Sequence, residues 1–171
     1  LRNSSAASDV YKRQQIGSLT LVFSVIALML LLIFKSFKIM VIGLIPNIFV
    51  ASSVVGILGL LKIPLDIMTI TVAAISVGMA VDNTIHYIYR YKKEIKATQS
   101  PELALLNAHT TTGRAIFYTA ATIATGFSIL SLSNFFPTQL FGIFTALAML
   151  VAFISSLSLL PNLLVKFKVF Q

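Results

Sequence analysis

Apolar residues along the chain form five long runs that are separated by short polar connections. Each run has about the 20 residues that a helix needs to cross the roughly 30 Å hydrocarbon core of a bilayer. Pro46 falls inside the second run, where we expect a kink rather than an end, because neighbouring helices in a membrane can satisfy the freed backbone. The pattern predicts membrane-spanning helices at residues 16–34, 39–61, 67–89, 113–133 and 139–161.

The connection between the third and fourth runs carries a helix signal of its own. Ser100, Pro101 and Glu102 stand in the order of an N-cap, a first-turn proline and a first-turn acid, and leucines then recur at helical spacing. We expect a short helix at residues 101–111 on the cytoplasmic surface. The predicted fold class is therefore all-α: a polytopic membrane helix bundle of five transmembrane helices plus this surface helix.

The composition agrees with a membrane bundle and argues against several other classes. Of the 171 residues, 57% are apolar and only 11% are charged, whereas about a quarter of the residues of a soluble domain are charged. A soluble enzyme, a nucleic-acid binder and a disordered tail are therefore disfavoured, despite a net charge of +8. The chain has no cysteine, which removes disulfides and thiolate metal sites. We expect no enzymatic activity, cofactor, metal or nucleic-acid partner, and we expect the lipid bilayer as a partner.

The first residues differ in character from the rest of the chain. Residues 1–14 are polar and contain no apolar stretch of the kind that a signal peptide requires. The string LRNSSAASDVYKRQ resembles a translated sequencing adaptor. We expect this segment to be non-native and disordered, and we expect residues 15–171 to form a single transmembrane domain of a longer protein.

Basic residues are distributed unequally between the two ends of the predicted bundle. Nine fall at one end, whereas the opposite connections contain only Lys62. The positive-inside rule places the basic end in the cytoplasm. We therefore expect a multi-pass protein of the bacterial inner membrane with a cytoplasmic C-terminus. The nine basic residues are Lys35, Lys38, Arg90, Lys92, Lys93, Lys96, Arg114, Lys166 and Lys168.

Asp82 lies within the third span, where an ionised acidic side chain has a high free-energy cost. An ionised carboxylate at the centre of a helix in hydrocarbon costs about 2.5–3.5 kcal/mol on insertion scales. His86 lies one turn further along the same helix face, Asn83 lies beside the acid, and Gly78 one turn earlier leaves room for another helix or a water. The pattern favours a functional acid that binds a proton reversibly. A neutral, permanently hydrogen-bonded structural aspartate is the alternative.

Other polar and small residues within the spans are weaker candidates. Thr122 could form a hydrogen bond with Asp82 and is kept as a relay candidate, although packing is the alternative role for it. Like Gly78, Gly126 and Gly142 are expected to allow helices to approach closely.

Three further polar side chains are expected to be structural or ordinary. We expect Asn47 to bind the backbone that Pro46 frees. His109 is expected to be an ordinary residue of the surface helix, and Tyr87 is expected to belong to an aromatic belt at the membrane interface, together with Tyr89 and Tyr91.

Two stretches of the chain resemble a known family. The stretch VGMAVDNTIHYIYRYKKE at residues 77–94 resembles the aspartate-bearing helix of the resistance–nodulation–division (RND) superfamily, in particular its MmpL-like branch. The stretch from Gly113 to Leu150 is similar to the next two helices of that family, and the same unit is related to the sterol-sensing domain. The resemblance implies half of an RND transmembrane domain, and it looks like the C-terminal half. The implied partners are the N-terminal half and the extracytoplasmic domains, and a homo-oligomer is left open.

The resemblance also implies a function. It implies a fragment of a proton-motive-force-driven exporter, a proton antiporter of lipids or other hydrophobic compounds, with Asp82 as the intramembrane proton-relay acid. His86, Asn83 and Thr122 are the expected companions of Asp82 in the relay. Many relatives have a tyrosine directly after the aspartate, where this chain has Asn83, so the partner of Asp82 is left open. The alternative is a sterol-sensing-like lipid-binding or scaffolding membrane module without coupled transport.

Overall fold

The computed structural model describes the backbone of residues 2–63 and 67–170 and the side chains of residues 16–63 and 69–170. Within these ranges the regular elements are all helical. In chain order they are α1 (Arg2–Phe34), α2 (Phe37–Leu60), α3 (Ile67–Thr98), α4 (Pro101–Ala108), the π-turn η1 (His109–Gly113), α5 (Arg114–Ile129), the short 3₁₀ segment η2 (Leu130–Leu132), α6 (Phe136–Ile154), the π-turn η3 (Ser155–Leu159) and α7 (Leu160–Lys166).

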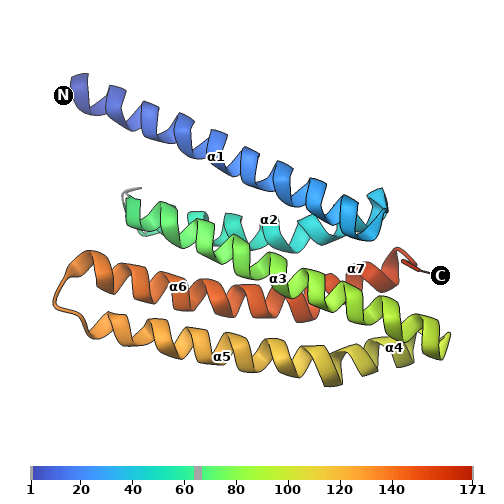
Figure 1. Cartoon of the computed structure of the whole chain (residues 1–171). Helices are drawn as coiled ribbons and strands as arrows, with labels where there is room; N and C mark the ends of the chain where they lie inside the picture. Colours follow the sequence, from blue (N-terminus) through green and yellow to red (C-terminus); the bar gives the residue numbers. More distant parts are fainter. Residues whose placement is uncertain (1, 64–66, 171) are drawn as a thin grey trace.

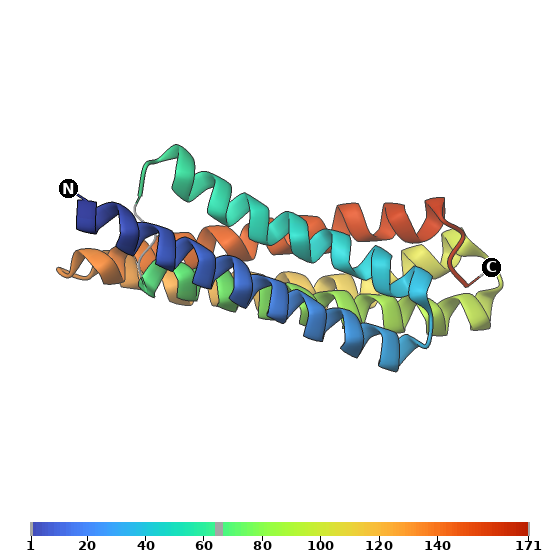
Figure 2. The ribbon, with the colours of Figure 1, turned by 90° about the horizontal axis from the view of Figure 1, so that it is seen from above.

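The helices form an elongated bundle in which successive helical runs reverse direction (Figure 1). α3 lies at the centre and packs against α1, α2, α4 and α6, while α5 packs mainly against α6. The ends of α1, α3 and α7 and the starts of α2 and α4 gather at one end of the bundle, as Figures 1 and 2 both show. The lysines predicted to be cytoplasmic therefore collect at one end, which is called the basic end below.

The lengths and apolar character of the helices confirm the predicted fold class. In the part of the chain that the structure describes, four helical runs are long and apolar enough to cross a membrane. α3 has 32 residues and is as long as these runs, but Asp82 and a charged C-terminal stretch make it more polar. The chain is thus an all-α bundle with four or five helices suited to a membrane. The four apolar runs are Ile16–Phe34, Phe37–Leu60, Pro101–Leu132 and Phe136–Lys166.

The first helix begins earlier than the sequence predicts. Residues 2–14, which were expected to be disordered, continue α1 back to Arg2. The physical reason is that this stretch contains no proline or glycine that would end a helix. Leu1 lies outside the described residues.

The predicted surface helix exists, but it is not a separate element. It forms α4, which continues through η1 into α5 as one helical run. Gly113, the residue best suited to end a helix there, has a helical φ of −59°. The helix widens into a π-turn over His109–Gly113 instead of ending there.

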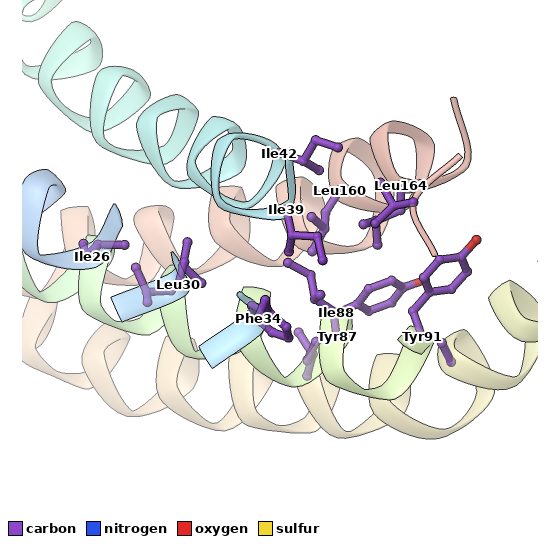
Figure 3. Packing of buried hydrophobic residues seen from close by; sticks show 14 of the residues in the cluster. Ile26, Leu30, Phe34, Ile39, Ile42, Tyr87, Ile88, Tyr91, Leu160 and Leu164 are labelled. Atoms are coloured by element: carbon purple, nitrogen blue, oxygen red, sulfur yellow. The ribbon is translucent and has the colours of Figure 1, made fainter. Parts of the chain in front are cut away.

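The largest buried cluster lies near the basic end and joins α1, α2, α3 and α7 (Figure 3). Tyr87 and Tyr91 are its largest members and are fully buried. They were expected to lie in an interfacial aromatic belt, but they point into the bundle because they occupy the same face of α3 as Ile88. Tyr89 lies on another face of α3 and is exposed.

Helices α5 and α6 approach each other closely at Gly142. A Cβ atom at this position would lie 2.5 Å from the carbonyl oxygen of Phe127 and 2.7 Å from the Cβ atom of Leu130. Only glycine fits such a backbone contact. Gly78 and Gly126 differ, because no atom of a neighbouring element lies within 4 Å of the Cβ position at either residue. Their small surfaces face away from the described part of the chain.

We expect the substitution Gly142→Ala to destabilise the protein, because the two backbones must separate to admit the methyl group. The loss should be about 1–3 kcal/mol, as for other overpacked sites. Gly56→Ala is the matched control, since nothing lies within 4 Å of the Cβ position there. The melting temperature of the complete protein in detergent measures both effects. Equal melting temperatures for the two variants would contradict this account of the α5–α6 contact.

Candidate functional site

Asp82 and His86 form a pair on the outer surface of α3. They lie one helical turn apart, and His86 Nε2 is 3.4 Å from a carboxylate oxygen of Asp82. The two side chains are 69% and 67% exposed, respectively. Within the described ranges, His86 is the one ionic partner of Asp82. The pair can therefore hold a charge-assisted contact when the imidazole is protonated.

The pair belongs to an exposed face of α3 that is lined with small side chains. Ala74, Gly78, Asp82 and His86 follow one another at intervals of four residues, so they share one face of the helix, and all are exposed. The buried residues of α3, such as Thr84 and Tyr87, lie on other faces of the helix. This surface is called the Asp82 face below.

The structure brings only part of the predicted relay together. Asn83 is next to Asp82 in the chain and is half-buried, and Thr122 is exposed on α5. Helices α3 and α5 share few contacts, whereas α6 packs against both of them. Among the described residues, neither Asn83 nor Thr122 is hydrogen-bonded to Asp82.

A buried hydrogen bond fixes the rotation of α3. The side-chain amide of Asn47 on α2 donates to the hydroxyl of Thr84 at 3.3 Å, and both residues are fully buried. Thr84 follows Asp82 by two residues, which is about 200° around an α-helix. Anchoring Thr84 inward therefore turns Asp82 outward.

Asn47 also binds the backbone of α2 beside Pro46, but the prediction that it binds the group freed by the proline is wrong. Pro46 lacks the N–H that would bind the carbonyl of Ile42. Asn47 donates to the next carbonyl instead, that of Gly43, at 2.6 Å. The hydroxyl of Ser155 donates to the carbonyl of Pro46 at 3.3 Å, which ties α2 at Pro46 to η3.

A second polar cluster joins α3 to α4 near the basic end. Arg90 and Glu94 form an ion pair of 2.8 Å on α3. The side-chain amide of Asn107 on α4 donates to the other carboxylate oxygen of Glu94 at 2.9 Å. These contacts fasten the basic end of α3 to the start of the next helical run.

Sequence reasoning missed the role of His109. Its Nδ1 atom lies 2.7 Å from the Tyr87 hydroxyl, and its Nε2 atom lies 3.0 Å from the carbonyl oxygen of Leu157. His109 thus joins α3 to η3 instead of lying on a free surface. The one signal in the sequence is Pro161, which follows Leu157 by four residues and provides no N–H for its carbonyl. Nothing in the sequence says that His109 is the donor.

The Asp82 face carries a pair of ionisable side chains and not a cluster of metal ligands. No three His, Asp or Glu side chains gather into a metal-binding group in the part of the chain that the structure describes. The Asp82 face instead offers one carboxylate and one imidazole, two groups that exchange protons readily.

Comparison with known proteins identifies the family. The model of the MMPL family matches residues 4–167. The protein named "Putative membrane protein MJ1562" from Methanocaldococcus jannaschii is 29% identical over 157 residues, which is 92% of this chain and 40% of that relative. The chain therefore spans less than half the length of this relative. No solved structure matches the chain. The family match covers nearly the whole chain and confirms the resemblance seen at residues 77–94 and 113–150, so the chain belongs to the MMPL family.

Proposed function

We propose that this chain is part of the transmembrane engine of a proton-motive-force-driven MMPL-type exporter, a proton antiporter in which Asp82 takes up and releases the proton. The observation that carries the proposal is the placement of Asp82. It lies within the predicted span of α3, its side chain is two-thirds exposed, and His86 is its one ionic partner among the described residues. Membership of the MMPL family supports a transport role.

The energetic cost of Asp82 argues that the Asp82 face is covered in the assembled protein. A charged side chain facing hydrocarbon costs about 2.5–3.5 kcal/mol on insertion scales. Ala74 and Gly78 on the same face are small enough for another helix to approach closely. In this proposal the cover is the other half of the transporter, which lies outside this chain together with the extracytoplasmic domains. A homo-oligomer is the second arrangement that would cover the face.

The proton cycle follows from the chemistry of the pair. A protonated His86 stabilises the ionised Asp82 across 3.4 Å. Proton uptake by Asp82 removes the ion pair and leaves a neutral carboxyl group, which costs less to expose to an apolar partner surface. The two states therefore favour different packing of the Asp82 face. In this proposal Asn83 and Thr122 are the polar side chains that serve as further hydrogen-bond partners across the covered interface.

A specific observation favours the alternative function. A groove of about 460 Å³ lies between α2 and α6 and is almost wholly apolar. Phe49, Gly56 and Leu60 line one side of it, and Val151 and Ile154 line the other. A lipid chain would fit such a surface, and a lipid-binding or scaffolding module would need no proton-binding acid. The exported compounds in the main proposal are lipids or other hydrophobic molecules, so both functions predict lipid binding and only one predicts coupling.

We expect Asp82→Asn to abolish proton-coupled transport by the complete protein. Removal of a proton-transferring group typically costs about 10²–10⁴ in rate. The assay follows export of a fluorescent phospholipid from proteoliposomes with an imposed pH gradient. Glu102→Gln is the matched control, because it also neutralises one carboxylate but lies exposed on α4.

The outcomes separate the two functions. Loss of gradient-dependent export in the Asp82 variant alone supports the relay, provided that both variants insert equally. The relay would be refuted if the Asp82 variant still exported the phospholipid and an uncoupler stopped that export. Phospholipid binding without gradient-dependent export, unchanged by either substitution, would favour the lipid-binding module.

We expect the basic end to face the cytoplasm of the inner membrane, because clustered basic residues resist translocation. Lys93 and Asn134 are exposed near opposite ends of the bundle, and the chain contains no native cysteine. A membrane-impermeant maleimide should label the variant Asn134→Cys in intact spheroplasts and should label Lys93→Cys only after permeabilisation. The reverse labelling pattern would overturn the proposed orientation.

A further inference from the structure

Two π-turns that are distant in sequence lie against each other near the basic end. They are η1 (His109–Gly113), between α4 and α5, and η3 (Ser155–Leu159), between α6 and α7. A Cβ atom at Gly113 would lie 3.5 Å from the side chain of Leu157, and the His109 ring reaches the Leu157 carbonyl. Single π-turns within α-helices are uncommon and occur often at functional sites. Their direct contact here suggests that they act together.

The ring nitrogens of His109 lie close to three oxygen atoms. A backbone carbonyl can only accept, so the tautomer with its proton on Nε2 donates to the Leu157 carbonyl at 3.0 Å. In that neutral tautomer Nδ1 is an acceptor, so the hydroxyl of Tyr87 donates to it at 2.7 Å, and the Leu105 carbonyl, 3.3 Å from Nδ1, receives no proton from the ring. One ring therefore connects α3, η1 and η3. Tyr87 is fully buried, so these bonds are shielded from water.

Pro161 explains why the Leu157 carbonyl uses a side-chain donor. In a regular α-helix this carbonyl would accept from the N–H of residue 161, which proline lacks. A buried carbonyl without a partner costs about 1–3 kcal/mol. The imidazole of His109 supplies the missing donor from another helical run. This bond joins two different helical runs, so it can break without disrupting either helix.

The segments on the two sides of the π-turns are held differently. On the outer side, α5 and α6 approach each other so closely at Gly142 that only glycine fits. On the basic side, α4 and α7 are short, with eight and seven residues, and side-chain contacts hold them. Ala104 of α4 and Leu160 of α7 pack in the largest buried cluster, and Asn107 of α4 is bonded to Glu94. A change of register in a π-turn would alter the tilt of these short helices while α5 and α6 stay packed.

We propose that η1 and η3 form a paired hinge at which α4 and α7 change tilt together, and that His109 is the latch that holds the hinge closed. In the closed state, His109 donates to the Leu157 carbonyl. When the latch opens, the N–H of Asn162, five residues along, is the next backbone donor that this carbonyl can use. Opening therefore exchanges a bond between elements for a bond within one helix.

Hydrogen exchange of the complete protein in nanodiscs tests the latch. His109→Leu removes both bonds of the ring, and we expect the backbone amides of residues 155–160 to exchange at least about tenfold faster. His109→Gln retains an amide donor and should restore most of the protection. Pro161→Ala gives the Leu157 carbonyl a backbone donor, so adding His109→Leu to it should change the exchange little.

Two results would overturn the latch. One is equal acceleration by His109→Leu with and without Pro161→Ala, which would show that the imidazole acts only through packing. The other is unchanged exchange in His109→Leu. If that variant does not accumulate, Tyr87→Phe takes its place, because it removes only the hydroxyl. Faster exchange at residues 109–113 is then expected, and unchanged exchange there would refute the latch.

Spin-label distances test the hinge itself. Leu103 on α4 and Asn162 on α7 are exposed, so a nitroxide pair at these positions reports their relative tilt. We expect His109→Leu to broaden the distance distribution of this pair. A second pair at Leu60 and Leu132, on the outer ends of α2 and of the α5 run, should remain unchanged. Broadening of both pairs, or of neither, would overturn the hinge.

Discussion

The need to satisfy every backbone hydrogen-bonding group inside the protein governs this bundle more than any other constraint. Hydrocarbon offers no alternative partners, so each N–H that a proline removes must be compensated by the surrounding structure. Pro46 and Pro161 both stand within helical runs, and each is accompanied by side chains from another element. Ser155 donates to the carbonyl of Pro46 itself, and His109 donates to the Leu157 carbonyl, which Pro161 leaves without a backbone donor. The same contacts tie the helical runs to one another.

This constraint also determines which face of α3 carries chemistry. Thr84, Tyr87 and Ile88 recur at helical spacing and are fully buried. Thr84 and Tyr87 are hydrogen-bonded to neighbouring elements, whereas Ile88 packs in the largest buried cluster. With this face anchored by specific bonds, α3 cannot rotate without leaving buried polar groups unpaired. Asp82 and His86 are consequently held on the outside. Both side chains are therefore exposed on the surface of α3.

The sequence predicts the helical spans well, because long apolar runs and their basic flanks are local features. It also locates Asp82, since a carboxylate within a span is visible without a structure. The ends of α1 and the continuity of α4 with α5 were predicted less well. Helix ends depend on weak signals, and a π-turn leaves no distinct pattern in composition.

The contact between His109 and Leu157 could not be predicted for a different reason. The two residues are 48 positions apart, and neither hydrophobic periodicity nor charge pattern links them. The proline that affects the Leu157 carbonyl is visible in the sequence, but its compensating donor is set by how the helices pack. The burial of Tyr87 could not be predicted either, because an aromatic residue near a helix end fits a lipid interface and a protein interior equally well.

Asp82 and the proposed His109 latch are close enough along α3 for a movement at one to reach the other. Tyr87 follows Asp82 by five residues, which is about 7.5 Å along the axis of α3. The helix between them is continuous, so a shift of α3 at Asp82 is transmitted to the Tyr87 hydroxyl and hence to His109. In the proposed proton cycle, a change in charge at Asp82 would alter how the Asp82 face packs against its partner, and the resulting displacement of α3 would stretch or relax the latch. A small movement suffices, because hydrogen bonds weaken steeply as their geometry departs from the ideal. Proton binding at one face of α3 would thereby control the tilt of α4 and α7 at the basic end.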